Sequence, residues 1–108
     1  MISQPQRDIR QRGLIPPERL ANLQAVVIGV GAIGRQVAIQ LACIGIPRLV
    51  LFDHDTVGPE NLAVQGYWPE DLGHLKVETT ARLCRRILPE LEVTDVAQRF
   101  RRQDAVGL

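Results

Sequence analysis

Short apolar runs and stretches of helical periodicity alternate along the chain. The runs 25–30 and 49–52 contain no alternating polar positions, which is typical of strands covered on both faces. Residues 32–43 and 75–88 repeat apolar positions at helical spacing, and 91–97 is expected to form a third strand. This order predicts an α/β, Rossmann-like, three-layer fold with a parallel sheet and right-handed crossovers, the N-terminal half of a doubly wound nucleotide-binding fold.

Each predicted helix has an apolar side that is expected to face the sheet. Gly45 and Pro47 are expected to end the first helix. Its residues expected to face the sheet are Ile33, Val37, Ala38, Leu41 and Ala42. In the second helix the expected buried residues are Val77, Ala81, Cys84 and Leu88, with Lys76, Arg82, Arg85 and Arg86 outside that face.

The pattern divides the chain into two parts. Residues 1–24 are predicted to form an N-terminal helical arm, and residues 25–108 a nucleotide-binding α/β domain. Three strands are about half of a doubly wound sheet, so this domain is expected to be incomplete, with a partner chain or a further C-terminal part covering its apolar face. Residues 54–74 are irregular, and long loops inside compact domains are usually functional or contain short helices.

The composition is that of one small globular domain. Of 108 residues, 45% are hydrophobic and 23% are charged, and the net charge of +1 gives no electrostatic case for binding nucleic acid or a membrane surface. The N-terminus does not resemble a signal peptide, and no apolar run approaches the ~20 residues of a membrane span, so a cytoplasmic location is expected. Cys43 and Cys84 form no C-x-x-C pair, which favours buried thiols over a zinc or redox site.

A glycine-rich turn joins the first strand to the first helix. Gly29, Gly31 and Gly34 fit G-x-G-x-x-G, and Asp53 follows at the tip of the second strand. The first glycine permits a tight turn, the second lets the backbone approach a phosphate, and the third lets the helix pack closely on the strand. The helix N-terminus offers unpaired N–H groups to an anion, and Asp53 can accept hydrogen bonds from ribose hydroxyls. The chain is therefore predicted to bind a nucleotide.

The residues beyond Asp53 narrow the class of nucleotide-binding protein. Residues 53–65 read D-H-D-T-V-G-P-E-N-L-A-V-Q, and residues 71–78 read D-L-G-H-L-K-V-E. They resemble the ThiF/MoeB/HesA family, bacterial relatives of the ubiquitin-activating enzymes, whose pattern is roughly D-x-D-x-V-x-x-x-N-L-x-R-Q followed by G-x-x-K-[VA]-E. The arm fits this resemblance, because R-D-I at residues 7–9, with Gly13 following, looks like the R-Q-I…G segment that precedes the first strand of the family.

The resemblance implies adenylation. Family members bind ATP and magnesium, and they activate the C-terminal glycine carboxylate of a small ubiquitin-like protein as an acyl-adenylate, releasing pyrophosphate. Attack by a carboxylate on the α-phosphate brings two anions together, so cations and amide donors are needed there. The chain is accordingly expected to be the ATP-binding part of such an enzyme, with a ubiquitin-like carrier protein as substrate and a homodimer as its assembly.

The same resemblance implies the site residues. Lys76 matches the family lysine at the phosphates, and Arg7 matches an arginine that reaches the ATP of the other protomer, with Arg10 as the alternative if the register slips. The residues implied to bind the nucleotide are Gly29, Gly31, Gly34, Asp53, Asp55, Asn61 and Gln65. Some of these residues keep a structural alternative. Asp55 could cap the loop, and Asn61 and Gln65 could stabilise it through their side chains. Lys76 could be an ordinary exposed lysine at the start of a helix.

Two departures from the family pattern limit what the chain is expected to do alone. The arginine of N-L-x-R-Q is Val64 in this sequence, so one phosphate-binding cation is missing. The magnesium-binding aspartate, the zinc-binding cysteine pairs and the acceptor cysteine of many members lie on later segments, so the metal ligand is expected outside this chain. The resemblance therefore implies a chain that holds adenosine and part of the phosphates and is poor or inactive as a catalyst, either as a piece of a longer enzyme or as a stand-alone degenerate relative.

Two other classes of function stay open. The G-x-G-x-x-G turn with Asp53 is sufficient for an NAD-binding oxidoreductase fragment, although Asn61 in the long loop and the downstream Lys76 argue against that class. A non-catalytic module that binds a nucleotide, docks a ubiquitin-like protein or dimerises would account for Val64 and for the missing aspartate.

Overall fold

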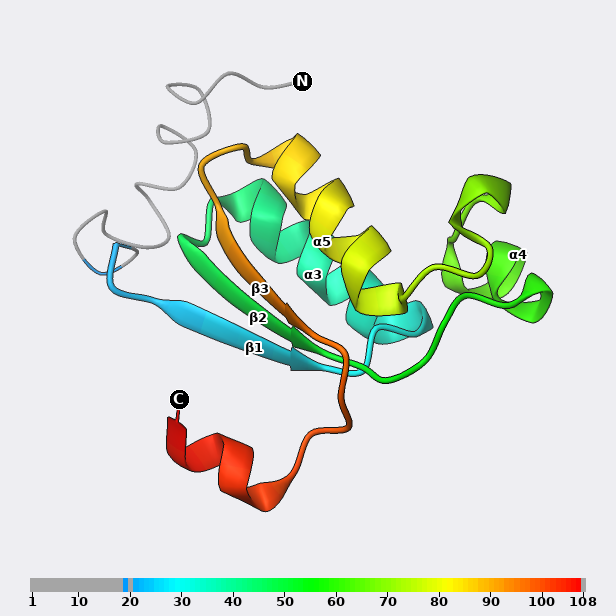
Figure 1. The fold of residues 1–108 in the computed structure, drawn as a ribbon. Coiled ribbons are helices and arrows are strands. Elements are labelled where there is room, and N and C mark those ends of the chain that lie inside the picture. Colours follow the sequence, from blue (N-terminus) through cyan, green and yellow to red (C-terminus); the bar gives the residue numbers. More distant parts are fainter. Residues whose placement is uncertain (1–18, 20, 108) are drawn as a thin grey trace.

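Three parallel strands form the sheet on which the rest of the chain packs. Strands β1 (Gln24–Ile28), β2 (Arg48–Phe52) and β3 (Glu92–Val96) lie side by side in that order. Both neighbouring pairs are parallel, and the arrows in Figure 1 end at one edge of the sheet. The three strands and the parallel sheet predicted from the sequence are confirmed.

The computed structural model describes residue 19 and residues 21–107. Most of the arm predicted for residues 1–24 lies outside these residues, so the arm remains a prediction.

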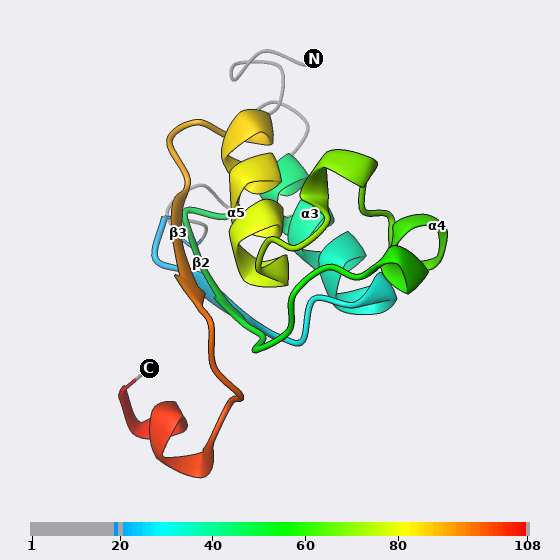
Figure 2. The ribbon, with the colours of Figure 1, turned by 45° about the vertical axis from the view of Figure 1, so that its right-hand side comes forward.

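Two long helices cover one face of the sheet. Helix α3 (Ala32–Ile44) connects β1 to β2, and helix α5 (Lys76–Ile87) connects β2 to β3. Two successive crossovers of the same hand, stepping the same way across the sheet, place both helices on the same face, as Figures 1 and 2 show. Within the residues that the structure describes, no helix combines the length and apolar character needed to cross a membrane.

The end of α3 follows the sequence prediction. Gly45 is left-handed, with φ of 90°, a conformation that glycine adopts without steric cost. The N–H groups of Gly45 and Ile46 donate to the carbonyls of Ala42 and Leu41, both at 3.1 Å. These bonds satisfy carbonyl groups that the end of the helix would otherwise leave without partners.

The core lies between the sheet and the two helices. Val27, Leu49 and Leu51 supply its strand residues. The helix residues of the core are Ala38, Ala42, Val77, Ala81, Cys84 and Leu88. The apolar face predicted for the second helix is therefore confirmed. Alanine at three of these positions leaves little side chain between helix and sheet, so the two layers pack closely.

The face predicted for α3 is partly wrong. Ala38 and Ala42 are buried, but Ile33 is 82% exposed and Val37 is 42% exposed. The buried stripe of α3 contains Arg35, Ala38 and Ala42. Neighbouring residues lie about 100° apart around a helix, so a helix that turns this stripe inward turns Ile33 and Val37 outward. The prediction was right for Ala38 and Ala42 and wrong for Ile33 and Val37, because it assumed that every apolar residue of the helix faces the sheet.

The opposite face of the sheet carries no long helix in the described part of the chain. Ile28 and Phe52 point to this face, because their strand neighbours Val27 and Leu51 point into the core. Ile28 is 59% exposed, whereas the ring of Phe100 packs edge-on against Phe52 with ring centroids 5.0 Å apart.

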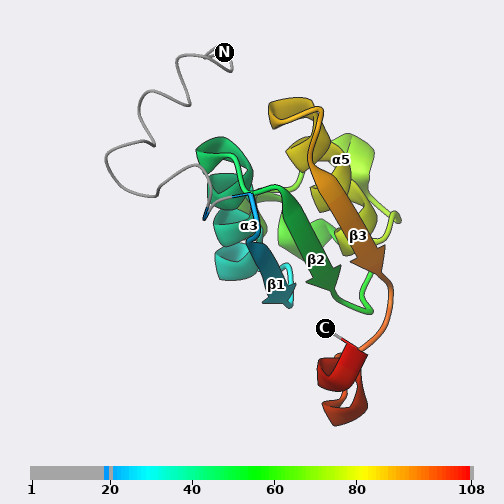
Figure 3. The same ribbon diagram turned by 90° about the vertical axis from the view of Figure 1, so that its left-hand side faces the viewer.

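The segment after β3 continues past the carboxyl edge of the sheet to a short helix, η3 (Arg102–Gly107), as Figure 3 shows. The α/β Rossmann-like class is confirmed, and the described residues supply the sheet and one helical layer of it.

The irregular stretch 54–74 contains short helices of its own. They are η1 (Pro59–Asn61), α4 (Leu62–Gln65) and η2 (Pro69–Asp71). Thr56 forms an isolated antiparallel bridge with Leu75, so the end of this stretch returns to its beginning. The first residue of α5 is thereby held next to the residues that follow β2.

The two cysteines are expected to differ in reactivity. Burial raises the pKa of the Cys84 thiol to about 11, and its Sγ donates to the Ala38 carbonyl at 3.6 Å. Cys43 is exposed. Because the thiolate is the reactive form, iodoacetamide at mildly alkaline pH should label Cys43 and spare Cys84 in the native chain. Peptide mass spectrometry, with labelling in guanidinium chloride as control, checks this, and labelling of native Cys84 at the rate of Cys43 would contradict the packing described.

Candidate nucleotide-binding site

The glycine-rich turn lies at the carboxyl end of β1, directly before α3. Gly29 has a φ of 87°, in the left-handed region that favours glycine, and its N–H donates to the Phe52 carbonyl at 2.7 Å. Gly31 is the N-cap residue of α3. The first N–H groups of a helix have no partner within it, and they carry the positive end of the helix dipole. The turn therefore presents donors and positive potential at the edge of the sheet.

Gly34 packs back onto this turn. A Cβ atom on Gly34 would lie 1.7 Å from the Gly29 carbonyl oxygen and 2.8 Å from the Gly29 carbonyl carbon. Both are backbone atoms, so no side-chain rotation can relieve the overlap. The close approach predicted for the third glycine of the motif is confirmed in its geometry.

Asp53 follows β2 and braces the turn. Its Oδ2 accepts a hydrogen bond from the Val30 N–H at 2.9 Å, and its Oδ1 accepts one from the Asp55 N–H at 2.8 Å. The two bonds fix the orientation of the carboxylate beside the glycine turn. Each carboxylate oxygen has a second lone pair, so Asp53 can still accept a hydrogen bond from a ligand hydroxyl.

Lys76, the first residue of α5, reaches the same edge. Its Nζ lies 4.0 Å from Asp55 Oδ2, and its backbone N–H donates to the Asp55 carbonyl at 3.0 Å. The prediction that Lys76 lies outside the buried face of its helix is wrong, because the residue is only 6% exposed. The other Asp55 oxygen is 3.3 Å from His54 Nε2. Lys76 is thus linked through Asp55 to Asp53.

The two amide residues of the loop behave differently. Asn61 is buried, and its Oδ1 accepts a hydrogen bond from the Gly58 N–H at 2.8 Å, which is the loop-stabilising alternative. The carboxamide of Gln65 lies against the turn, and a Cβ atom on Gly31 would be 3.6 Å from Gln65 Oε1. This Oε1 is buried and has no hydrogen-bond partner among the described residues. Gln65 therefore holds an available acceptor beside the glycine turn.

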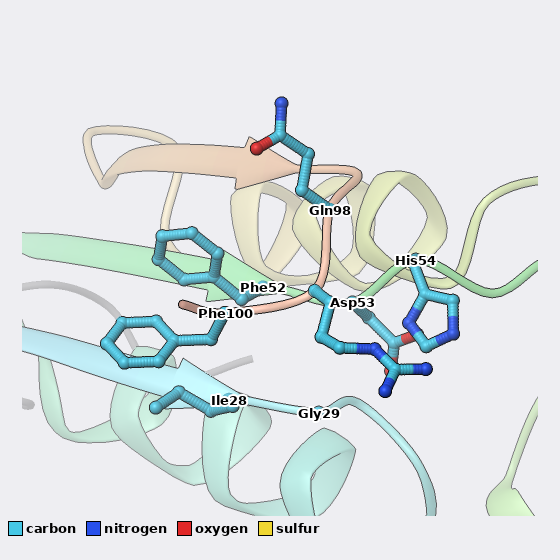
Figure 4. A pocket seen from close by; sticks show the side chains of 8 residues that line it. Ile28, Gly29, Phe52, Asp53, His54, Gln98 and Phe100 are labelled. Carbon is cyan, nitrogen blue, oxygen red and sulfur yellow. The ribbon is translucent and has the colours of Figure 1, made fainter. Parts of the chain in front are cut away.

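A pocket of about 180 Å³ adjoins the turn on the open face of the sheet. Its lining residues are Ile28, Gly29, Phe52, Asp53, His54, Gln98, Arg99 and Phe100. In Figure 4 the apolar side chains of Ile28, Phe52 and Phe100 gather on one side. Asp53 and His54 lie on the other side. Aromatic walls beside a carboxylate suit a planar base that carries a sugar.

The sequence analysis missed a buried group of side chains behind the turn. Arg35 is only 1% exposed, and its guanidinium lies 4.1 Å over the ring of Tyr67. Its Nε donates to the Gly66 carbonyl at 3.2 Å, and its Nη1 donates to Thr80 Oγ1 at 2.9 Å. The Tyr67 hydroxyl donates to the Val30 carbonyl at 2.5 Å, so this group holds the turn from the side opposite Asp53.

One signal in the sequence pointed to this group. Arg35 precedes Ala38 and Ala42 by three and seven residues, which is the spacing of one helix face. A face predicted from apolar residues alone does not include an arginine, although the spacing of Arg35 fits it. Tyr67 gave no comparable signal, because its partner Val30 is 37 positions away.

Three neighbouring residues after β2 offer atoms that could bind a metal ion. Asp53, His54 and Asp55 bring one ligand atom each within 4.8 Å of one another. Magnesium prefers octahedral oxygen ligands, but both Asp53 oxygens already accept backbone N–H groups, and Asp55 faces Lys76 and His54. A magnesium ion at these residues would therefore compete with the backbone N–H groups, Lys76 and His54 for the carboxylate oxygens. Arg7 and Arg10 lie outside the described residues, and their roles remain predictions.

Comparison with known proteins identifies the family. The profile of the ThiF family matches residues 5–108. The chain belongs to the ThiF family. Among ThiF-like relatives, ubiquitin-like modifier-activating enzyme 5 of Drosophila ananassae is 36% identical over 76 residues, which cover 70% of this chain and 19% of that protein. The enzyme of the same description from Aedes aegypti is 34% identical over 76 residues, with the same two coverages. The chain thus spans about a fifth of the length of these curated relatives.

Solved structures with this ThiF-type fold include proteins crystallised with ATP. E. coli tRNA N6-threonylcarbamoyladenosine dehydratase, TcdA, in complex with ATP matches with a TM-score of 0.83 and 27% identity, over 99% of this chain and 46% of that chain. E. coli MccB with ATP matches with a TM-score of 0.75 and 28% identity, over 83% of this chain and 27% of that chain.

Substitutions of Gly31 and Gly34 by alanine should differ in their effect on stability. Gly34→Ala places a methyl group on the Gly29 carbonyl, and we expect it to lower the free energy of unfolding by about 3 kcal/mol or more. Gly31→Ala meets only the Gln65 side chain at van der Waals distance, so we expect a change of at most about 1 kcal/mol. Urea unfolding followed by circular dichroism measures both. Equal stability of the two variants would refute the close contact between α3 and the turn.

Proposed function

We propose that this ThiF-family chain is the ATP-binding part of an enzyme that adenylates the C-terminal glycine of a small ubiquitin-like protein. The observation that carries the proposal is a continuous line of contacts along one sheet edge. It runs from the aromatic pocket to Asp53, from Asp53 to the glycine turn through Val30, and from Asp53 through Asp55 to Lys76. A nucleoside polyphosphate needs four groups in order from its base to its phosphates: an aromatic slot, a carboxylate, a helix N-terminus and a lysine.

The adenosine end is assigned to the pocket. Adenine would pack against Phe52 and Phe100, whose rings offer an apolar surface at the carboxyl edge of the sheet. The ribose hydroxyls would donate to Asp53, which is already held by two backbone N–H groups and needs no reorientation. Nucleotides bind outside the carboxyl ends of the strands in open α/β sheets, which supports this location.

The phosphate end is assigned to the turn and to Lys76. The free N–H groups at the start of α3 would face the phosphates, and Gly31 lets the backbone come close to them. The ammonium group of Lys76 now faces Asp55 across 4.0 Å, a loose pairing that phosphate oxygens could replace. The Gln65 carboxamide lies against Gly31, and its oxygen, which has no partner among the described residues, could accept a hydrogen bond from a ligand hydroxyl or water.

These groups suit the chemistry of adenylation. The carboxylate oxygen of the carrier attacks the α-phosphorus, a new phosphorus–oxygen bond forms, and the bond to pyrophosphate breaks with its electron pair leaving on pyrophosphate. Positive charge placed before the reaction lowers the repulsion between the two anions. Magnesium would neutralise the leaving group, and we propose that its ligand lies outside this chain.

The matched relatives support two parts of the proposal, the ubiquitin-like carrier protein as substrate and ATP as nucleotide. Matched curated proteins are described as ubiquitin-like modifier-activating enzymes, and the MccB structures include complexes with ATP and with MccA. We propose that the substrate is a small ubiquitin-like protein. We also propose that the chain acts as a homodimer, in which Arg7 of each protomer reaches the ATP bound to the other.

A second candidate is a non-catalytic nucleotide-binding module. Val64 is 75% exposed on α4, and its apolar side chain offers no charge to a phosphate. The same feature would also hold for a catalytic domain completed by further segments, so the exchange measurement below decides between the candidates.

The first prediction concerns the ligand. Isothermal titration calorimetry should detect ATP binding and much weaker NAD binding. Asp53→Asn removes one of the two backbone bonds of this side chain, so the affinity for ATP should fall at least about tenfold. Glu90→Gln, an exposed change away from the turn, is the control. Tight binding of NAD without ATP would overturn the proposal in favour of an oxidoreductase.

The second prediction concerns Lys76. In the product of the full reading frame, ATP–pyrophosphate exchange should depend on a ubiquitin-like protein with a free C-terminal glycine. Lys76→Ala should lower the exchange rate by about 100-fold, because a preplaced charge at the phosphates is lost. Arg82→Ala, on the exposed side of the same helix, should leave it unchanged. Exchange that survives Lys76→Ala removes Lys76 from the mechanism, and absence of exchange with every carrier supports the non-catalytic module.

A further inference from the structure

Arg35 is a buried cation without an acidic partner. Its guanidinium contacts the Gly66 carbonyl, the Thr80 hydroxyl and the Tyr67 ring, all of them neutral groups. No carboxylate lies within ion-pair distance of it among the residues that the structure describes. An arginine cannot lose its proton in a protein, so the positive charge stays in place despite the burial.

The position of Arg35 makes this charge more unfavourable still. Its own N–H donates to the Gly31 carbonyl at 2.9 Å, so Arg35 lies in the first turn of α3. That turn carries the positive end of the helix dipole, where a cation is disfavoured and an anion is favoured. Burial and dipole therefore both oppose the guanidinium in the free chain. An anion bound in front of the same turn would offset both costs by its attraction to the guanidinium.

The neighbours of Arg35 connect it to the glycine turn. The Tyr67 hydroxyl, whose ring stacks on the guanidinium, donates to the Val30 carbonyl. Gly66, whose carbonyl accepts from Arg35, directly follows Gln65, and the Gln65 carboxamide lies against Gly31. Burial raises the pKa of Tyr67, and the charge of Arg35 opposes that rise, so the charge acts on a group bonded to the turn.

We propose that Arg35 is a positioning residue with an electrostatic role. Its buried charge stabilises the polyphosphate of the nucleotide from behind the glycine turn, without touching it. This inference rests on the proposed function, because it takes ATP as the ligand. It would also supply positive charge to a site whose neighbouring helix α4 carries the exposed apolar side chain of Val64 beside Gln65.

The test separates charge from geometry by comparing two ligands. The dissociation constants for ATP and for adenosine are measured by calorimetry on the 108-residue chain, and their ratio reports the stabilisation of the phosphates. Arg35→Met keeps a long side chain and removes the charge. This variant should lower the affinity for ATP about tenfold more than the affinity for adenosine. That factor is the effect expected of one charge within roughly 10 Å of the phosphates at an effective dielectric constant of about 20. Arg35→Lys keeps the charge and should preserve the ratio.

Two further variants serve as matched controls. Tyr67→Phe removes the hydroxyl bond to Val30 but keeps the ring beneath the guanidinium, so both affinities should fall by the same factor. Val64→Arg, introduced into Arg35→Met, adds a cation on α4 beside Gln65, whose carboxamide lies against Gly31, and should restore most of the ratio. Equal losses of ATP and adenosine affinity in Arg35→Met would overturn the electrostatic role and leave a structural one.

A measurement on the native chain covers the case in which Arg35→Met does not fold. The Nε–H group of Arg35 is buried and hydrogen-bonded, so its NMR signal should be resolved from those of exposed arginines. It should shift with ATP and with inorganic tripolyphosphate but not with adenosine. A signal that stays fixed while the amides of Gly29 and Gly31 shift with ATP contradicts the inference and leaves the proposed function standing. A native chain that binds no adenine nucleotide overturns both.

Discussion

The contact between Gly34 and the Gly29 carbonyl sets how closely α3 approaches the end of β1. Any side chain at position 34 would overlap backbone atoms, so the helix can start directly over the turn only with glycine. This contact also sets the rotation of the helix. With the Gly34 side against the strand, Arg35 turns into the protein and Ile33 turns out to solvent. The placement of the α3 N-terminus over the turn and of the charge behind it therefore have one common cause.

The parallel sheet gathers the remaining groups at the same edge. Because all three strands end there, the residues after each strand become neighbours: the glycine turn after β1, Asp53 after β2 and Phe100 after β3. Asp53 and Tyr67 then hold Val30 from its N–H and its carbonyl, so the turn is fixed before a ligand arrives. Such preorganisation favours binding, since little conformational freedom is lost when the nucleotide enters.

The sequence predicted the parts of the site that depend on local geometry. Glycine spacing, strand ends and the G-x-x-K motif identified the turn, Asp53 and Lys76, because each has a fixed offset from a secondary-structure boundary. Arg35 and Thr80, which are 45 positions apart, could not be paired from sequence, because their contact depends on how α3 and α5 pack. The exposed Ile33 was mispredicted for the same reason: periodicity finds a helix, but the rotation of the helix is decided by the closest tertiary contact.

The central claim is that one nucleotide occupies the whole edge, from the aromatic pocket to Lys76. A crystal structure of the chain with a non-hydrolysable ATP analogue tests it most directly. The account predicts adenine against Phe52 and Phe100, ribose hydroxyls on Asp53, and phosphates before Gly31 with Lys76 turned from Asp55 toward them. An analogue bound elsewhere, or bound with its phosphates away from the glycine turn, would contradict it.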